Sequence, residues 1–169
     1  MVSGLTDLHA AIDARVRSIR DAHPEWPCSK GCDSCCRRLA EIPTLTEAEW
    51  RLLRQGLAAL PDNQLRVIRL KVATLEQQST RPLVCPMLDL TSGACPVYAQ
   101  RPVACRSYGY YVQRDAGLYC PDIETRVAAG ELADVVWGNH DAVERRLHAT
   151  GDARPLTVWF QNWFRAEAV

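Results

Sequence analysis

Four of the eight cysteines in this 169-residue chain lie within one short segment, residues 28–36, which reads C-S-K-G-C-D-S-C-C. Thiolate sulfur is the soft ligand that zinc, copper(I) and iron–sulfur clusters take in proteins. Eight thiols divide naturally into two sets of four, which suits two tetrahedral zinc sites or two cubane clusters. We therefore predict that all eight bind metal: Cys28, Cys32, Cys35, Cys36, Cys85, Cys95, Cys105 and Cys120.

The spacing within the first segment suggests how these ligands are shared. Three residues separate Cys28 from Cys32, and two separate Cys32 from Cys35, so these three sulfurs can reach one centre. Cys35 and Cys36 are neighbours, and their side chains leave the backbone in different directions. The adjacent pair therefore favours two centres, or one polynuclear cluster that presents several metal faces.

Composition limits the classes of protein that the chain can represent. Hydrophobic residues make up 47% and charged residues 24%, as in a globular domain. Lys+Arg and Asp+Glu are both 20, which argues against a nucleic-acid partner held by bulk charge. No apolar run reaches the roughly 18 residues of a membrane span, and the first ten residues do not resemble a secretory signal. We expect a cytoplasmic protein, in which clustered thiols stay reduced and favour metal over disulfides.

Other interpretations of the cysteines remain open at this point. Cys120 is the most isolated and could be a small buried hydrophobic residue, and a disulfide framework is a second alternative. The spacing of Cys28, Cys32 and Cys35 also occurs in radical S-adenosylmethionine enzymes, which carry it after the first strand of a β/α barrel. Here it follows a helical pattern and two prolines, and the chain is shorter than the roughly 200 residues of a barrel.

Helical patterns flank the cysteine-rich part of the chain. Residues 5–22 carry apolar side chains at three- and four-residue intervals. Thr46 and Glu49 form a capping-box pattern that begins a helix to about residue 60, and Asp62 or Asn63 can cap the next helix to about residue 78. Asn139 can cap a further helix to about residue 148, and an aromatic-rich helix is expected at 156–166. The predicted flanking helices are thus 5–22, 46–78 and 139–166.

The segment between these helices has a different character. Residues 82–121 replace helical periodicity with prolines, glycines and four cysteines, which predicts turns, short strands and one short helix near residues 97–100. Such a segment has no core of its own, so we expect it to depend on bound metal for its shape. The fold class that follows is mainly α: a small single domain over residues 1–169, organised around an irregular Cys/Pro-rich core at 28–120.

Three separated motifs together resemble a known family. They are C-S-K-G-C-D-S-C-C, C-P-M-L-D-L-T-S-G-A-C-P-V-Y and R-P-V-A-C-R-S-Y, followed by a final cysteine. In this order they are similar to the YkgJ-type cysteine-cluster family, also described as the CxxCxxCC zinc- or iron-chelating domain. The first gap here is three residues instead of two. The resemblance covers residues 28–120 and implies that all eight cysteines belong to the signature.

The resemblance also implies surroundings for the metal. It places segments 93–98 and 101–108 around the centre. Arg101 and Arg106 flank Cys105 and could donate hydrogen bonds to cluster sulfurs. With Tyr108, they are the candidate cofactor-contacting residues. Flagellin lysine methylases contain a similar region associated with an iron–sulfur cluster, but no methyl-donor site can be assigned in this chain.

The choice of metal is close and depends on ligand chemistry. Pro follows three of the cysteines, Cys85, Cys95 and Cys120, as it follows a ligand in bacterial ferredoxins. This pattern and the adjacent cysteines favour iron–sulfur, most simply [4Fe–4S], with zinc as the alternative. Two functions stay open: a binding protein that stores, carries or senses metal or passes electrons, and a metalloenzyme or cluster-bearing component of a protein-modifying system. The sequence identifies no protein partner.

Overall fold

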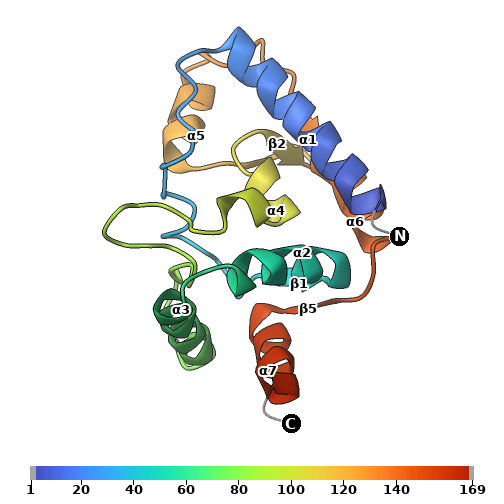
Figure 1. The fold of residues 1–169 in the computed structure, drawn as a ribbon. Helices are drawn as coiled ribbons and strands as arrows, with labels where there is room; N and C mark the ends of the chain where they lie inside the picture. The colour runs from blue at the N-terminus through green and yellow to red at the C-terminus, as the bar shows by residue number, and fades with distance from the viewer. Residues whose placement is uncertain (1–2, 168–169) are drawn as a thin grey trace.

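The computed structural model describes residues 3–167 and is built mainly from helices (Figure 1). The helices are α1 (Ser3–Ala22), α2 (Glu47–Ala58), α3 (Asp62–Leu75), α4 (Val103–Ser107), α5 (Pro121–Ala128), α6 (His140–His148) and α7 (Leu156–Glu167), with a 3-10 turn η1 (Tyr98–Gln100). This confirms the mainly helical, single-domain fold class. Within the described residues, no helix is both long enough and apolar enough to cross a membrane.

Short strands connect parts of the chain that are distant in sequence. β1 (Thr44–Thr46) pairs antiparallel with β5 (Ala153–Pro155). β2 (Tyr111–Gln113) pairs antiparallel with β3 (Ala116–Leu118) and parallel with β4 (Gly138–Asn139). Short strands were expected only within 82–121, so β1, β4 and β5 were missed; each has two or three residues, too few to show an alternating pattern.

The predicted helix starts were right at two positions and wrong at a third. Thr46 and Glu49 form the expected capping box, with the Thr46 amide donating to Glu49 Oε2 over 2.9 Å. Asn139 caps α6 by accepting from the Ala142 amide over 3.1 Å. The predicted cap of α3 by Asp62 or Asn63 was wrong, because that helix already begins at Asp62 and its N-cap is Pro61, whose side chain makes no capping bond.

The buried apolar residues form two clusters rather than one. The first lies among α1, α5, α6 and the β2 sheet and includes Leu8, Ile12, Tyr110 and Ile123. The second lies among α2, α3, α7 and β1 and includes Leu45, Trp50, Leu57, Val72 and Phe160. Figure 1 shows the corresponding helix groups above and below, with α4 between them.

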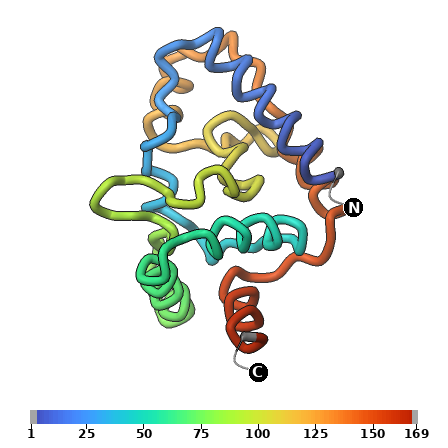
Figure 2. The backbone as a smooth tube through the Cα atoms, viewed as in Figure 1, coloured from blue at the N-terminus to red at the C-terminus, as the bar shows by residue number. Residues whose placement is uncertain are grey.

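The cysteine-rich segments cross the space between these two groups. In Figure 2, the light-blue chain after α1 and the yellow-green chain after α3 run side by side there. Leu39 and Leu83 join them by an antiparallel bridge, with N···O distances of 2.9 and 2.8 Å. As expected, residues 82–121 form no separate core. Leu83, Val97 and Val103 of this segment are nevertheless fully buried against the flanking parts of the protein. The short helix α4 within this segment was not predicted.

Candidate metal centre

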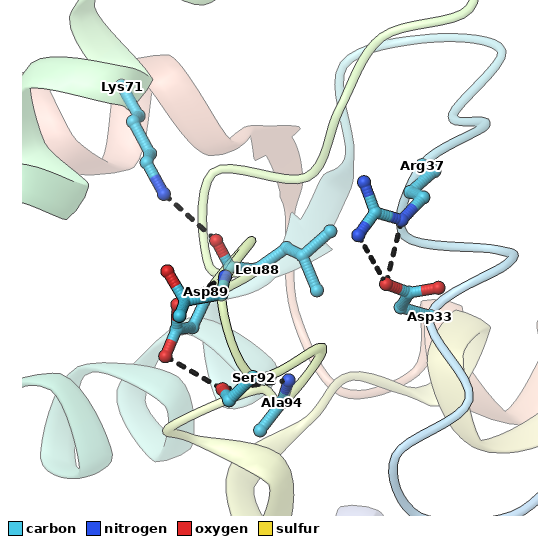
Figure 3. A network of polar contacts seen from close by, with 8 residues as sticks. Asp33, Arg37, Lys71, Leu88, Asp89, Ser92 and Ala94 are labelled. Atoms are coloured by element: carbon cyan, nitrogen blue, oxygen red, sulfur yellow. Dashed lines mark hydrogen bonds and ion pairs between the residues drawn. The ribbon is translucent and has the colours of Figure 1, made fainter.

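The first cysteine loop follows α1 and has no regular secondary structure. Gly31 adopts φ +99°, a conformation that favours glycine, and so lets the chain turn between Cys28 and Cys32. The loop is closed by short-range bonds from the Cys32 amide to the Ser29 carbonyl (3.1 Å) and from the Arg38 amide to the Cys35 carbonyl (3.2 Å). Arg37 pairs with Asp33 at 2.7 Å (Figure 3). Cys32 is exposed, while Cys28, Cys35 and Cys36 are half-buried.

The second loop, residues 85–95, lies against the first. The Cys85 amide donates to the Cys36 carbonyl over 2.7 Å, so these two cysteines are fixed side by side by the backbone. Asp89 shapes the loop by accepting from the Ser92 hydroxyl at 2.7 Å, and Lys71 of α3 holds it through the Leu88 carbonyl at 2.9 Å (Figure 3). A Cβ on Gly93 would lie 3.4 Å from Asp33 Oδ2, which shows how closely the two loops approach.

The last two cysteines stand on short helices. Cys105 lies on α4, whose N-terminus is capped by the buried Glu49 of α2: the Val103 amide donates to Glu49 Oε1 over 2.9 Å. Cys120 is the N-cap residue of α5 and is only 4% exposed, although it belongs to the same sulfur network described next. Pro121 directly after it suits the first position of that helix.

Electrostatic interactions connect the thiols of all eight cysteines. Cys28 interacts with Cys32, Cys35 and Cys120. Cys36 interacts with Cys35, Cys85 and Cys95, through hydrogen bonds with the first two. Cys105 interacts with Cys35, Cys36 and Cys95. All eight are free thiols, and Cys35 and Cys36 join the two ends of the network.

Burial and neighbouring cysteines raise the pKa of several of these thiols. Burial and the neighbouring cysteines raise the pKa of Cys28 to about 12. For Cys36, the bond with Cys35 lowers the pKa, but the bond with Cys85 and burial outweigh it and raise the value to about 12. The bond with Cys36, together with burial, raises the pKa of Cys35. The Cys105 residue has exposed surface, yet the atoms packed around its sulfur desolvate it and raise its pKa to about 12.

Two of the three candidate contact residues lie beside these sulfurs. Burial raises the thiol pKa of Cys95 and of Cys105, and the Arg101 charge partly offsets this rise. The Arg101 guanidinium stacks 3.9 Å from the Tyr98 ring centroid. Burial, with Cys120, Cys35 and Cys28 nearby, raises the pKa of Tyr108. Arg106 differs, because its three guanidinium nitrogens donate to Asp13 and to the carbonyls of Ala99 and Arg101 rather than to sulfur.

Several residues around the cysteines were not singled out from the sequence. The Tyr110 hydroxyl donates to the Cys28 carbonyl over 2.7 Å. Gly109 has φ +89°, and a Cβ there would lie 2.5 Å from Cys28 Sγ, so only glycine fits beside this sulfur. The sequence R-S-Y-G-Y directly after Cys105 could have pointed to both Tyr110 and Gly109. No sequence signal pointed to Asp13 or Glu49, because each lies on a helix that is distant in sequence from the cysteines it supports.

The donor set fits a thiophilic metal in its chemistry. Eight free thiols lie in one network, and soft sulfur suits zinc and iron–sulfur alike. As the side chains stand in residues 3–167, no three Cys, His, Asp or Glu groups converge tightly enough to enclose an ion.

Comparison with known proteins agrees with this donor set. No curated protein and no solved structure matches the chain. A family model, CxxCxxCC, described as "Putative zinc- or iron-chelating domain", matches residues 27–125, which is more than half of the chain and spans all eight cysteines. The chain therefore belongs to this family of metal-chelating cysteine-cluster domains.

Proposed function

We propose that the protein uses its eight cysteines to hold iron–sulfur and acts in metal handling, metal sensing or electron transfer within a reducing compartment such as the cytoplasm. One observation carries the proposal: eight free thiols form a single network where the two hydrophobic clusters meet. Thiolates gathered this closely repel one another unless cations neutralise them, so the network has a physical use for bound metal.

We propose two ligand sets, Cys28, Cys32, Cys35 and Cys120, and Cys36, Cys85, Cys95 and Cys105. Electrostatic interactions among the sulfurs support this division in part, since Cys28 interacts with Cys120, Cys32 and Cys35, and Cys36 interacts with Cys85 and Cys95. Cys35 also interacts with Cys95 and Cys105 across the division. Packing supports it too. Cys120 belongs to the first hydrophobic cluster and Cys28 packs against it, while Cys85 and Cys95 pack against the second. Cys35 and Cys36 then lie on opposite sides of the boundary.

Iron–sulfur is favoured over zinc by the surroundings of the second set. Arg101 lies near Cys95 and Cys105, where a fixed positive charge offsets thiolate charge and tunes a reduction potential. The adjacent Cys35 and Cys36 and the Pro residues after three cysteines favour it as well. Zinc in two four-cysteine sites remains the alternative, because the donor chemistry suits it equally.

A binding function is favoured over an enzymatic one. Four thiols for each of two centres leave no open coordination position, whereas catalytic metal sites keep one free. The competing proposal, a metalloenzyme, requires one cysteine to be outside the ligand set, so that a coordination position stays open. Cys32, the exposed member of the first set, is the cysteine that the competing proposal would leave without metal.

The deciding experiment purifies the protein anaerobically from iron-replete cells and measures iron, acid-labile sulfide and zinc per chain. The proposal predicts brown protein with about four or more irons and a similar amount of sulfide per chain. Colourless protein with about two zinc ions per chain would support the zinc alternative. A preparation with neither metal, folded and with eight titratable thiols, would contradict metal binding altogether.

A further inference from the structure

The Arg106 side chain is nearly buried, and oxygen acceptors surround its guanidinium. Its side chain is 10% exposed and donates to Asp13 of α1 at 3.1 Å, to the Ala99 carbonyl at 2.7 Å and to the Arg101 carbonyl at 3.0 Å. The planar guanidinium can serve these three directions at once, which a lysine ammonium on a flexible stem does less well. Nearby His9 is buried and its pKa is lowered to about 4 by burial and by Arg106, so Asp13 is the counter-charge at neutral pH.

The bonds to Ala99 and Arg101 hold the backbone that leads to Cys105, and the bond to Asp13 attaches it to α1. Ala99 and Arg101 lie between Cys95 and Cys105, and Arg106 directly follows Cys105 on α4. With five residues, α4 is too short to hold its own position. It is fixed from one side by Asp13 of α1 and from the other by Glu49 of α2, which caps it at the Val103 amide. Figure 1 shows α4 between these two helices.

We propose that the Asp13–Arg106 pair is a positioning device that holds residues 99–106 in place and thereby keeps Cys105 beside Cys36 and Cys95. Its relevance to metal rests on the proposed metal centre. Arg106 itself binds no metal and donates to no sulfur. It acts through two backbone carbonyls and through its attachment to α1, so that a helix formed at the start of the chain orders a ligand near residue 105.

The test compares Arg106→Gln, Arg106→Lys and Asp13→Asn with the unchanged chain by cobalt(II) titration, in which thiolate-to-cobalt absorption reports the sulfurs bound. We expect two cobalt ions per chain in the unchanged protein. In the variants, one site should weaken by about 10- to 100-fold, the usual effect of losing a group that orients a ligand, while the other keeps its affinity. Arg106→Lys should not restore the weakened site, because lysine lacks the planar fork.

Two controls separate positioning from general stability. Arg51→Gln removes the same charge from an exposed ion pair with Glu47 and should leave both sites unchanged. Val143→Ala destabilises the first hydrophobic cluster from α6 and, at equal loss of stability, should weaken the cobalt sites less than Arg106→Gln does. If Val143→Ala weakens cobalt binding as much as Arg106→Gln does at equal loss of stability, the positioning role is wrong.

A measurement on the metal-free protein distinguishes this inference from the proposed function. Hydrogen exchange of residues 99–106 should accelerate in Arg106→Gln and in Asp13→Asn, with α3 unchanged as an internal reference. Failure of the unchanged chain to bind cobalt would leave the proposed function to the iron and sulfide measurement, and exchange would still decide the positioning role. The Asp13 side chain is partly exposed, so Asp13→Asn should disturb folding least. Unaltered exchange of residues 99–106 in this variant would overturn the positioning role itself.

Discussion

At the residue scale, the proposed division of the eight cysteines into two ligand sets depends on the adjacent Cys35 and Cys36. Cys35 interacts with Cys28 as well as with Cys36, whereas Cys36 contacts Cys85 and Cys95. The sequence was enough to propose the eight ligands, because thiol type and density alone point to metal. It could not pair Cys36 with Cys85, since that depends on an amide-to-carbonyl bond between two loops far apart in the chain.

Replacing Cys35 or Cys36 with Ser tests this division directly. Each variant should lose metal, and the two should differ in the metal retained and in its absorption, because the lost sulfur belongs to a different set in each. The measurement is metal content and visible spectrum of anaerobically prepared protein. Ser34→Ala changes the same loop without removing a thiol and is the control. Full metal content and an unchanged spectrum in Cys36→Ser would show that Cys36 is a packing residue.

At the scale of elements, the long helices could be predicted and the connecting structure could not. The apolar spacing of α1 and the capping residues of α2 and α6 are local signals, and the structure confirms them. α4 lacks such a signal: it has one turn, and Glu49 and Asp13 fix it from outside. The expectation that 82–121 depends on metal also needs refinement, because Leu83 and Val97 are anchored in the cores independently of any sulfur.

Metal removal should therefore loosen the loops more than the helices. In metal-stripped protein, we expect hydrogen exchange to accelerate in residues 28–36 and 85–95, where short turns carry the sulfurs, while α1 and α3 keep most of their protection. Structural metal sites contribute folding free energy that such segments cannot supply themselves. Exchange mass spectrometry with and without metal makes the comparison. Equal protection of both loops in the two states would mean that the metal is peripheral to the fold.

At the scale of the whole molecule, the proposed metal centre lies where two hydrophobic clusters meet. Cys28 and Cys120 pack with one cluster and Cys85 and Cys95 with the other. Protein contacts also connect the halves, including the Glu49 bond to α4 and the β1–β5 pair. Bound metal would add cross-links between segments contributed by both halves, so folding and metal affinity should be coupled throughout the chain.

Release of thiol protons on metal binding predicts that metal affinity depends on pH. The pKa values of Cys28 and Cys36 are raised to about 12 in the metal-free protein, and the metal-bound form is thiolate, so binding at neutral pH releases protons. Affinity should rise with pH by about tenfold per pH unit for each proton released and fall on acidification. Chelator competition between about pH 6.5 and about pH 8 measures the slope. A flat profile would show that the bound thiols were already deprotonated.

The central claim is that all eight cysteines bind metal, and native alkylation followed by mass spectrometry tests it most directly. The protein is treated with a small thiol reagent under anaerobic conditions, once with its metal and once after a strong chelator. The account predicts that the metal-bound protein is protected at all eight positions, including the exposed Cys32 and Cys105, and that all eight react after chelation. Rapid labelling of Cys32 and Cys105 in metal-replete protein, at the rate seen after chelation, would contradict it.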